Sequence, residues 1–143
     1  MSGKNQFISS LYWFSTNPAS TFLPLNNNTQ GQGSVTAGGA VNGTMSSTNT
    51  IYTNILDVSR MDNGGLEVAW TGTPTGTITY WASNSGISTN FFQITLTTNQ
   101  PAGSAGAFGI NLNQYPYKYL QLQYTNSSGS GTIAVYGQYK DLN

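Results

Sequence analysis

The sequence predicts an all-β protein, an antiparallel β-sandwich of about eight strands. Short stretches of the 143-residue chain alternate between apolar and polar residues, as strands with one buried face do. Gly, Asn, Ser and Pro separate these stretches at short, regular spacing, which is typical of turns. No stretch has the apolar spacing of an amphipathic helix. We expect one domain with a jelly-roll or immunoglobulin-like topology.

The first predicted strand is residues 7–14, which carry aromatic side chains on both faces. Such a strand is either covered on both sides, by its own sandwich and by a neighbouring subunit, or is an edge strand with a partly exposed aromatic. Residues 21–25 can add only a short edge strand, because Pro24 has no N–H to donate to a neighbouring strand.

Residues 26–50 consist almost entirely of Asn, Gly, Gln, Ser and Thr. Alone, such a segment cannot bury enough apolar area to offset the entropy that it loses on ordering. We expect a mobile arm or long loop that orders by lying across a neighbouring subunit. Its only apolar anchors would be Val35, Val41 and Met45. On this hypothesis residues 1–50 are a strand and an arm, and residues 51–143 are a sandwich core that folds without the arm.

The clearest strand pattern lies at residues 66–83, LEVAWTGTPTGTITYWAS. Two alternating stretches flank a Thr/Gly/Pro loop, which predicts a β-hairpin. Because successive side chains of a strand point to opposite faces, one set of apolar residues should face the core. That set is Leu66, Val68, Trp70, Ile78 and Tyr80.

Residues 119–139 repeat this order, with YLQLQY, a Ser/Gly loop and TIAVYGQY, and predict a second hairpin. The two hairpins would form the two walls of the sandwich. In the second hairpin, the residues expected to face the core are Leu120, Leu122, Tyr124, Ile133, Val135 and Gly137. The residues expected to point outward are Gln121, Gln123, Thr132 and Gln138. Further strands are predicted at residues 51–58, at 91–97 with Phe92, Ile94 and Leu96 inward, and at 107–112, with a turn at 59–65.

Charged residues make up only 6% of the sequence and the net charge is zero, whereas about 25% charged residues is usual. Without a basic surface we expect no binding to nucleic acid and no electrostatic binding to membranes. A neutral surface of Asn, Gln, Ser, Thr and Gly gives little repulsion between copies, so association is favoured. We expect a homo-oligomer, with a trimer as the default.

The sequence contains no Cys and no His. Disulfides, thiol chemistry, the commonest general base and most metal ligands are therefore absent. Three carboxylates lie close in sequence, but Asp62 falls in a turn and Glu67 on an outward strand face, which does not suit a catalytic pair. A Ca²⁺ site on Asp57, Asp62 and Asn63 lacks the spacing of an EF-hand loop. We expect no enzyme activity, no cofactor and no metal.

The remaining candidates for a binding site are the aromatic side chains that the strand pattern points outward. Aromatic residues serve protein–protein interfaces, and with nearby amides they also form sugar-binding platforms. The shortage of charges favours the interface, and the glycan stays an alternative. The candidates are Phe7, Tyr12, Phe14, Trp81, Tyr117, Tyr119 and Tyr136.

Three segments resemble a group of small proteins encoded among the virion structural genes of tailed bacteriophages: residues 55–65, 70–86 and 100–143. The W-T-G-T-P turn, the S-N-S-G turn and the Y-P-Y-K-Y-L corner recur together in that group. The resemblance implies a non-enzymatic β-sandwich subunit present in many copies on a virion. The main hypothesis is a capsid decoration (cement) subunit with the major capsid protein as partner, and a head-fibre base is a variant of it. The alternatives are a carbohydrate-binding adhesion module and a tail or baseplate adaptor.

The segment before residue 18 lacks an apolar run of signal-peptide length, and no stretch is long and apolar enough to span a membrane. We therefore expect synthesis in the host cytoplasm without export by the usual signal. Together with the resemblance, this predicts localisation to the virion.

Overall fold

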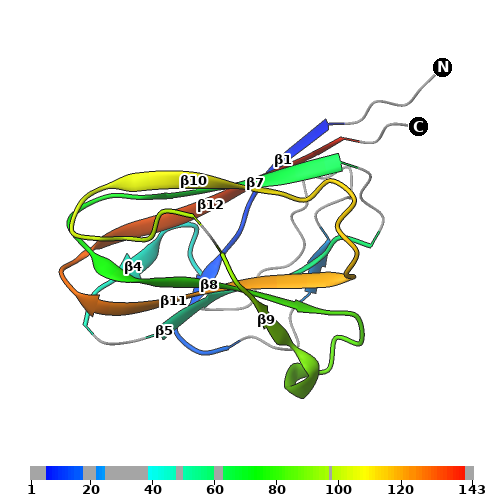
Figure 1. Cartoon of the computed structure of the whole chain (residues 1–143), viewed down its shortest axis with the longest axis horizontal. Helices are drawn as coiled ribbons and strands as arrows, with labels where there is room; N and C mark the ends of the chain where they lie inside the picture. Colours follow the sequence, from blue (N-terminus) through cyan, green and yellow to red (C-terminus); the bar gives the residue numbers. More distant parts are fainter. Residues whose placement is uncertain are drawn as a thin grey trace.

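The computed structural model describes residues 6–17, 22–24, 39–47, 50–59, 63–96 and 98–140. They form two β-sheets packed face to face (Figure 1), which confirms the predicted all-β antiparallel sandwich. In the described part of the chain, the one helical element is a 3₁₀ turn, Ser88–Asn90. The strands are β1 (Gln6–Ser10), β2 (Trp13–Phe14), β3 (Phe22–Pro24), β4 (Gly43–Met45), β5 (Thr50–Thr53), β6 (Ile55–Asp57), β7 (Asn63–Trp70), β8 (Thr75–Ser83), β9 (Phe92–Ile94), β10 (Gly106–Asn111), β11 (Tyr119–Ser128) and β12 (Gly131–Lys140).

The connectivity is that of a jelly roll. Sheet A places β12 between β7 and the pair β1 and β4, with β10 beyond β7. Sheet B places β11 between β8 and the pair β5 and β6, with β9 beyond β8 and with β2 and β3 at the opposite edge. Most consecutive strands therefore lie in different sheets, as in a double-sheet jelly roll. This order excludes the immunoglobulin-like alternative, in which several consecutive strands share a sheet.

The prediction that residues 66–83 and 119–139 each form a hairpin is wrong, because the two strands of each segment do not pair with each other. β7 belongs to sheet A and β8 to sheet B, and β11 and β12 are divided in the same way. Each segment is therefore an arch that joins the two sheets. The partners come from the other arch: β7 pairs with β12, from Trp70 opposite Ile133 to Asn63 opposite Lys140, and β8 pairs with β11.

The loops of the two arches lie against each other at one end of the sandwich. The Thr71 N–H donates to the Thr132 carbonyl and the Thr73 N–H to the Ser130 carbonyl, each at 2.9 Å. The hydroxyls of Thr71 and Thr132 share a further hydrogen bond of 2.8 Å. At Gly131 an added Cβ would overlap the Thr71 carbonyl oxygen. Glycine is therefore required here by close approach of the backbone.

The predicted core faces are confirmed. All five residues of the first inward set are buried, and so is the whole of the second set. Two assignments differ. Phe92 is 42% exposed; it lies on β9, at the edge of sheet B. Gln121, predicted outward, is 2% exposed, because its amide donates to Asn17 Oδ1 and to the Thr53 carbonyl, each at 2.9 Å.

The predicted strand at residues 51–58 contains a β-bulge. Tyr52 lies opposite Gln123, but Leu56 lies opposite Leu120, so one extra residue is inserted against β11. At the bulge the Thr53 hydroxyl accepts a hydrogen bond of 2.9 Å from the Leu122 N–H, in place of a backbone carbonyl. The bulge breaks the alternation, and both Ile55 and Leu56 are consequently buried.

The first fifty residues contribute to both sheets. The strand predicted at residues 7–14 breaks at Leu11 and Tyr12, so that β1 pairs in sheet A and β2 in sheet B. The expected short edge strand is present as β3, although it pairs in parallel with β6. We expected no regular structure between residues 26 and 50. That is wrong for β4, which pairs with β12 and buries Met45 completely; residues 25–38, with Val35, lie outside the described part.

Candidate binding site

The structure does not bring the seven candidate aromatics together. Phe7 lies on β1, where its side chain is outside the described part, and Tyr136 lies on β12, both in sheet A. The others lie in or beside sheet B. Phe14 is only 5% exposed, so its assignment as a surface contact is wrong. Phe14 lies on β2, opposite Tyr52 of β5.

Three of the half-buried candidates are engaged within the chain. The Trp81 Nε1–H donates to Thr79 Oγ1 at 2.9 Å, which uses the one donor of the indole. The Lys118 ammonium lies 5.1 Å from the ring centroid of Tyr119, a cation–π contact. The interaction with Tyr119 also raises the pKa of Lys118. Tyr12 makes a hydrogen bond through its backbone: its N–H donates to Asn54 Oδ1 at 2.8 Å.

Tyr117 belongs to an aromatic cluster that runs from the core to the edge of sheet B. Its ring lies edge-on to Phe92 at 5.1 Å and to Tyr115 at 5.5 Å, and Tyr115 stacks on the buried Tyr80 at 6.0 Å, all between centroids. The Tyr115 hydroxyl donates to the Tyr119 carbonyl at 3.1 Å. Burial raises the pKa of Tyr80 to about 12 and also raises the pKa of Tyr115. This cluster is structural and holds the 113–118 corner on the sandwich.

The raised pKa of Tyr80 predicts a loss of stability in alkali. An unfolded tyrosine ionises near its ordinary pKa of 10.0, whereas folded Tyr80 keeps its proton until about pH 12. Between these values the unfolded chain binds fewer protons, so the free energy of unfolding falls as the pH rises, by up to about 1.4 kcal/mol per pH unit for each such group. Thermal melts followed by circular dichroism should show this fall, and Tyr80→Phe should make it shallower. A midpoint that stays constant through about pH 12, or an unaltered slope in Tyr80→Phe, would contradict the assignment.

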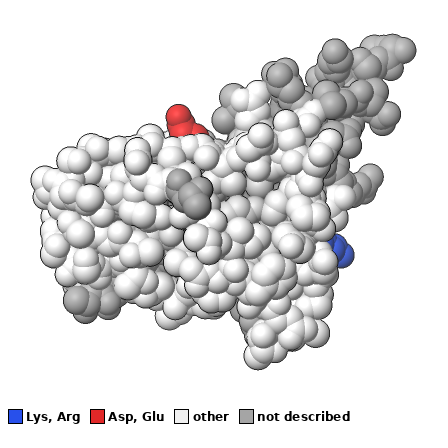
Figure 2. Space-filling view, viewed as in Figure 1, with Lys and Arg blue, Asp and Glu red and all other residues white. Residues whose placement is uncertain are grey.

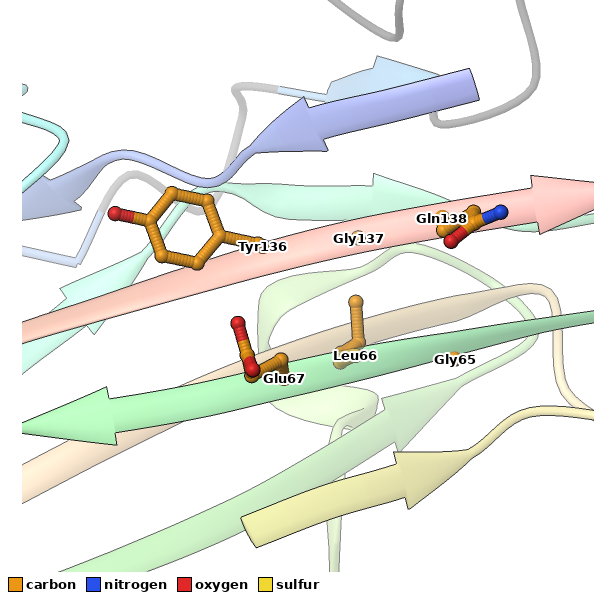
Figure 3. A pocket seen from close by; sticks show the side chains of 6 residues that line it. All are labelled: Gly65, Leu66, Glu67, Tyr136, Gly137 and Gln138. Atoms are coloured by element: carbon orange, nitrogen blue, oxygen red, sulfur yellow. The ribbon is translucent and has the colours of Figure 1, made fainter. Parts of the chain in front are cut away.

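Of the candidates whose side chains the structure describes, Tyr136 is the most exposed to solvent. It is 38% exposed on the outer face of sheet A and lies directly opposite Glu67 in the β7–β12 pairing. Gln138 follows on the same face, and opposite Gln138 stands Gly65, which has no side chain. Gly65 is among the residues that line an open pocket of about 420 Å³ on this face. Figure 3 shows Tyr136 and Glu67 beside each other on neighbouring strands, with Gln138 further along β12.

The backbone does not require glycine at position 65, in the lining of this pocket. Residues 63–65 were expected in a turn, but they continue β7, with no left-handed φ at Gly65. An added Cβ at Gly65 would lie 3.4 Å from the Ile110 carbonyl oxygen, an ordinary contact. Gly109, which lies opposite Glu67 on β10, also has room for a Cβ. A strand glycine of this kind often marks a place where a ligand or another backbone comes close.

The pattern of outward residues identified Tyr136 and placed Glu67 outward, but it missed that they form one site with Gln138. Their grouping depends on β7 pairing with β12, strands that the sequence assigned to different hairpins. The pair of glycines before Leu66 was a usable signal, because a glycine within a strand leaves space on the sheet face.

The described residues contain no cluster of three or more potential metal ligands. The Asp57 carboxylate accepts hydrogen bonds from the backbone N–H and the hydroxyl of Ser59, at 3.0 and 2.6 Å. Asp62, the third carboxylate of the sequence cluster, lies outside the described part. None of the helical structure described here could cross a membrane.

No protein-family model and no curated protein sequence matches the chain. Among solved structures it is similar to the K1 cleaved adhesin domain of Lys-gingipain from Porphyromonas gingivalis W83. The sequence identity is 15% and the TM-score is 0.46, over 97% of this chain and 99% of that chain. This likeness is too distant to bear on function.

Proposed function

We propose that this protein is a non-enzymatic structural subunit of a bacteriophage virion, a capsid decoration protein that binds neighbouring copies and the major capsid protein. The observation that carries the proposal is a rigid jelly-roll sandwich with an almost uncharged surface. On the face shown in Figure 2, Lys, Arg, Asp and Glu cover only small areas. Such a surface suits many weak contacts that add up across a symmetric shell.

The two outer sheet faces offer contact areas in which most side chains are uncharged. On the outer face of sheet A, small side chains lie in a row across three strands, with Ala107 opposite Ala69 and Ala69 opposite Ala134. On the outer face of sheet B, Thr79 lies opposite Gln123, and Thr77 opposite Thr125. The first face permits close approach of a partner, and the second offers hydroxyl and amide groups for hydrogen bonds.

The arrangement of acidic groups supports a non-enzymatic role. Asp57 lies on β6 in sheet B and Glu67 on β7 in sheet A, so these two carboxylates do not face one cleft. Carboxylate chemistry on a glycosidic bond requires two such groups flanking one substrate. Among the described residues that line the pocket at Tyr136, one is a carboxylate, Glu67.

The test is a cryo-electron microscopy map of particles of the phage that encodes this chain. We expect density for the two-sheet jelly roll repeated over the icosahedral shell, in contact with the major capsid protein and with further copies of itself. Light scattering on the purified protein would test whether it forms the expected trimer. Density confined to the tail or baseplate would replace the decoration role with that of an adaptor, and particles without the sandwich would overturn the proposal.

One observation favours a second candidate, the carbohydrate-binding adhesion module. A sugar platform combines an aromatic ring that lines an open pocket with a nearby amide. Tyr136 and Gln138 meet that description.

A further inference from the structure

We propose that the pocket beside Tyr136 is a saccharide-binding site that takes a neutral hexopyranose ring. The Tyr136 ring, the Glu67 carboxylate and the Gln138 amide are the polar and aromatic groups among the residues that line the pocket, and Gly65 is part of the same lining. Its volume of about 420 Å³ falls within the range of ligand pockets in proteins, about 300–1,000 Å³. The proposal stands independently of a role in the virion.

The positions of the three side chains follow from the strand register. Tyr136 and Glu67 are directly opposite, which sets their Cβ atoms about 5 Å apart. Gln138 is two residues further along β12, about 7 Å from Tyr136 on the same face. A six-membered pyranose ring placed over the Gly65 backbone therefore has Gln138 across from it on β12, Glu67 next to it along β7 and Tyr136 on the diagonal.

The hydrogen-bonding capacity of the site matches sugar hydroxyls, each of which donates and accepts. The Glu67 carboxylate only accepts, the Gln138 amide donates twice and accepts, and the Tyr136 hydroxyl does both. In the described part of the chain, no hydrogen bond or ion pair engages any of these three side chains. The aromatic face of Tyr136 supplies the apolar surface on which the C–H groups of a pyranose ring pack.

The charge of the site favours a neutral ligand. Among the lining residues that the structure describes, the one charged group is the Glu67 carboxylate, which would repel an anionic ligand. A cation would pair with an exposed carboxylate, an interaction usually worth about 1 kcal/mol or less. A cation would also leave the two donors of Gln138 without an acceptor. A neutral polyol uses all three side chains.

The binding test is a nuclear magnetic resonance titration of the full-length protein with the methyl glycosides of glucose, galactose, mannose and N-acetylglucosamine. We expect at least one of them to shift the resonances of Tyr136, Gln138 and the Gly65 amide. Tyr136→Ala should weaken that binding by about tenfold, since it removes the stacking surface. Glu67→Gln and Gln138→Ala should each weaken it by a smaller factor. Phe92→Ala is the matched control, because Phe92 is similarly exposed but lies on β9 in the other sheet.

Gly65→Ala separates binding from folding. The added methyl group fits the backbone of β7, so we expect an unchanged or slightly raised melting temperature. The same methyl group occupies the pocket floor, so sugar binding should weaken. Gly109→Ala places a methyl group on the neighbouring strand, outside the lining residues, and should leave binding unchanged.

The proposal is overturned if none of the four glycosides shifts these resonances, or if Tyr136→Ala and Gly65→Ala bind as the unaltered protein does. Shifts produced instead by methylguanidinium would identify a site for cationic side chains of a protein partner. Neither result would decide whether the protein is present on a virion, which the particle map tests separately.

Discussion

Replacing Gly131 with alanine is expected to destabilise the protein by about 3 kcal/mol or more, because the new Cβ overlaps the Thr71 carbonyl oxygen. The φ angle of Gly131 is not left-handed, so the loss comes from steric overlap alone. To relieve the overlap, the two arch loops would have to separate, which breaks the hydrogen bonds that Thr71 and Thr73 make with Thr132 and Ser130. A thermal melt should show a midpoint about 10 °C lower.

Gly109→Ala is the matched control for this substitution. Gly109 also lies within a strand, but its added Cβ would be 3.7 Å from the nearest atom, the Leu66 carbonyl oxygen. We expect this variant to be as stable as the unaltered protein or slightly more stable, since alanine loses less backbone entropy on folding. Equal midpoints for Gly131→Ala and Gly109→Ala would show that the arches do not touch as described.

Met45→Ala is expected to cost about 2–5 kcal/mol, the usual range for removing most of a buried Met side chain. Met45 is fully buried, although it lies in the polar segment that was expected to be a detachable arm. Chemical denaturation would measure the loss. Thr44→Ala, on the exposed face of the same strand, should change stability by less than about 0.5 kcal/mol. If residues 39–47 belonged to an independent arm, both variants would unfold at the same denaturant concentration.

Strand positions and buried faces could be predicted from the sequence, because they depend on neighbouring residues. The alternation at residues 66–70 fixes which side chains face the core, whatever the partner strand is. Pairing could not be predicted in the same way. The loop TGTPTG can close a hairpin or an arch, and what decides between them is the contact of Thr71 and Thr73 with residues some sixty positions away.

The same reason limited the prediction of the binding site. Outward alternation identified Tyr136, and the absence of His and Cys removed whole classes of chemistry. The neighbours of Tyr136 could not be predicted, because Glu67 and Gly65 lie near it only as a result of the β7–β12 pairing. Burial of Gln121 was missed for a related reason, since its amide is bonded to Asn17, a residue 104 positions away in the sequence.

The central place of β12 in sheet A also determines when the chain can fold. β12 joins β7 on one side to β1 and β4 on the other, so residues 6–10 find their partners only at residues 136–140. Topologies built from such distant pairings fold slowly, in roughly milliseconds to seconds, because a long loop must close before any pairing is gained. While the ribosome is still adding residues before Gly131, β1, β4 and β7 lack their shared neighbour. The β7–β10 pair can form earlier, but β1 and β4 can join sheet A only after β12 has been synthesised, and until then these two strands are open to chaperones or to one another.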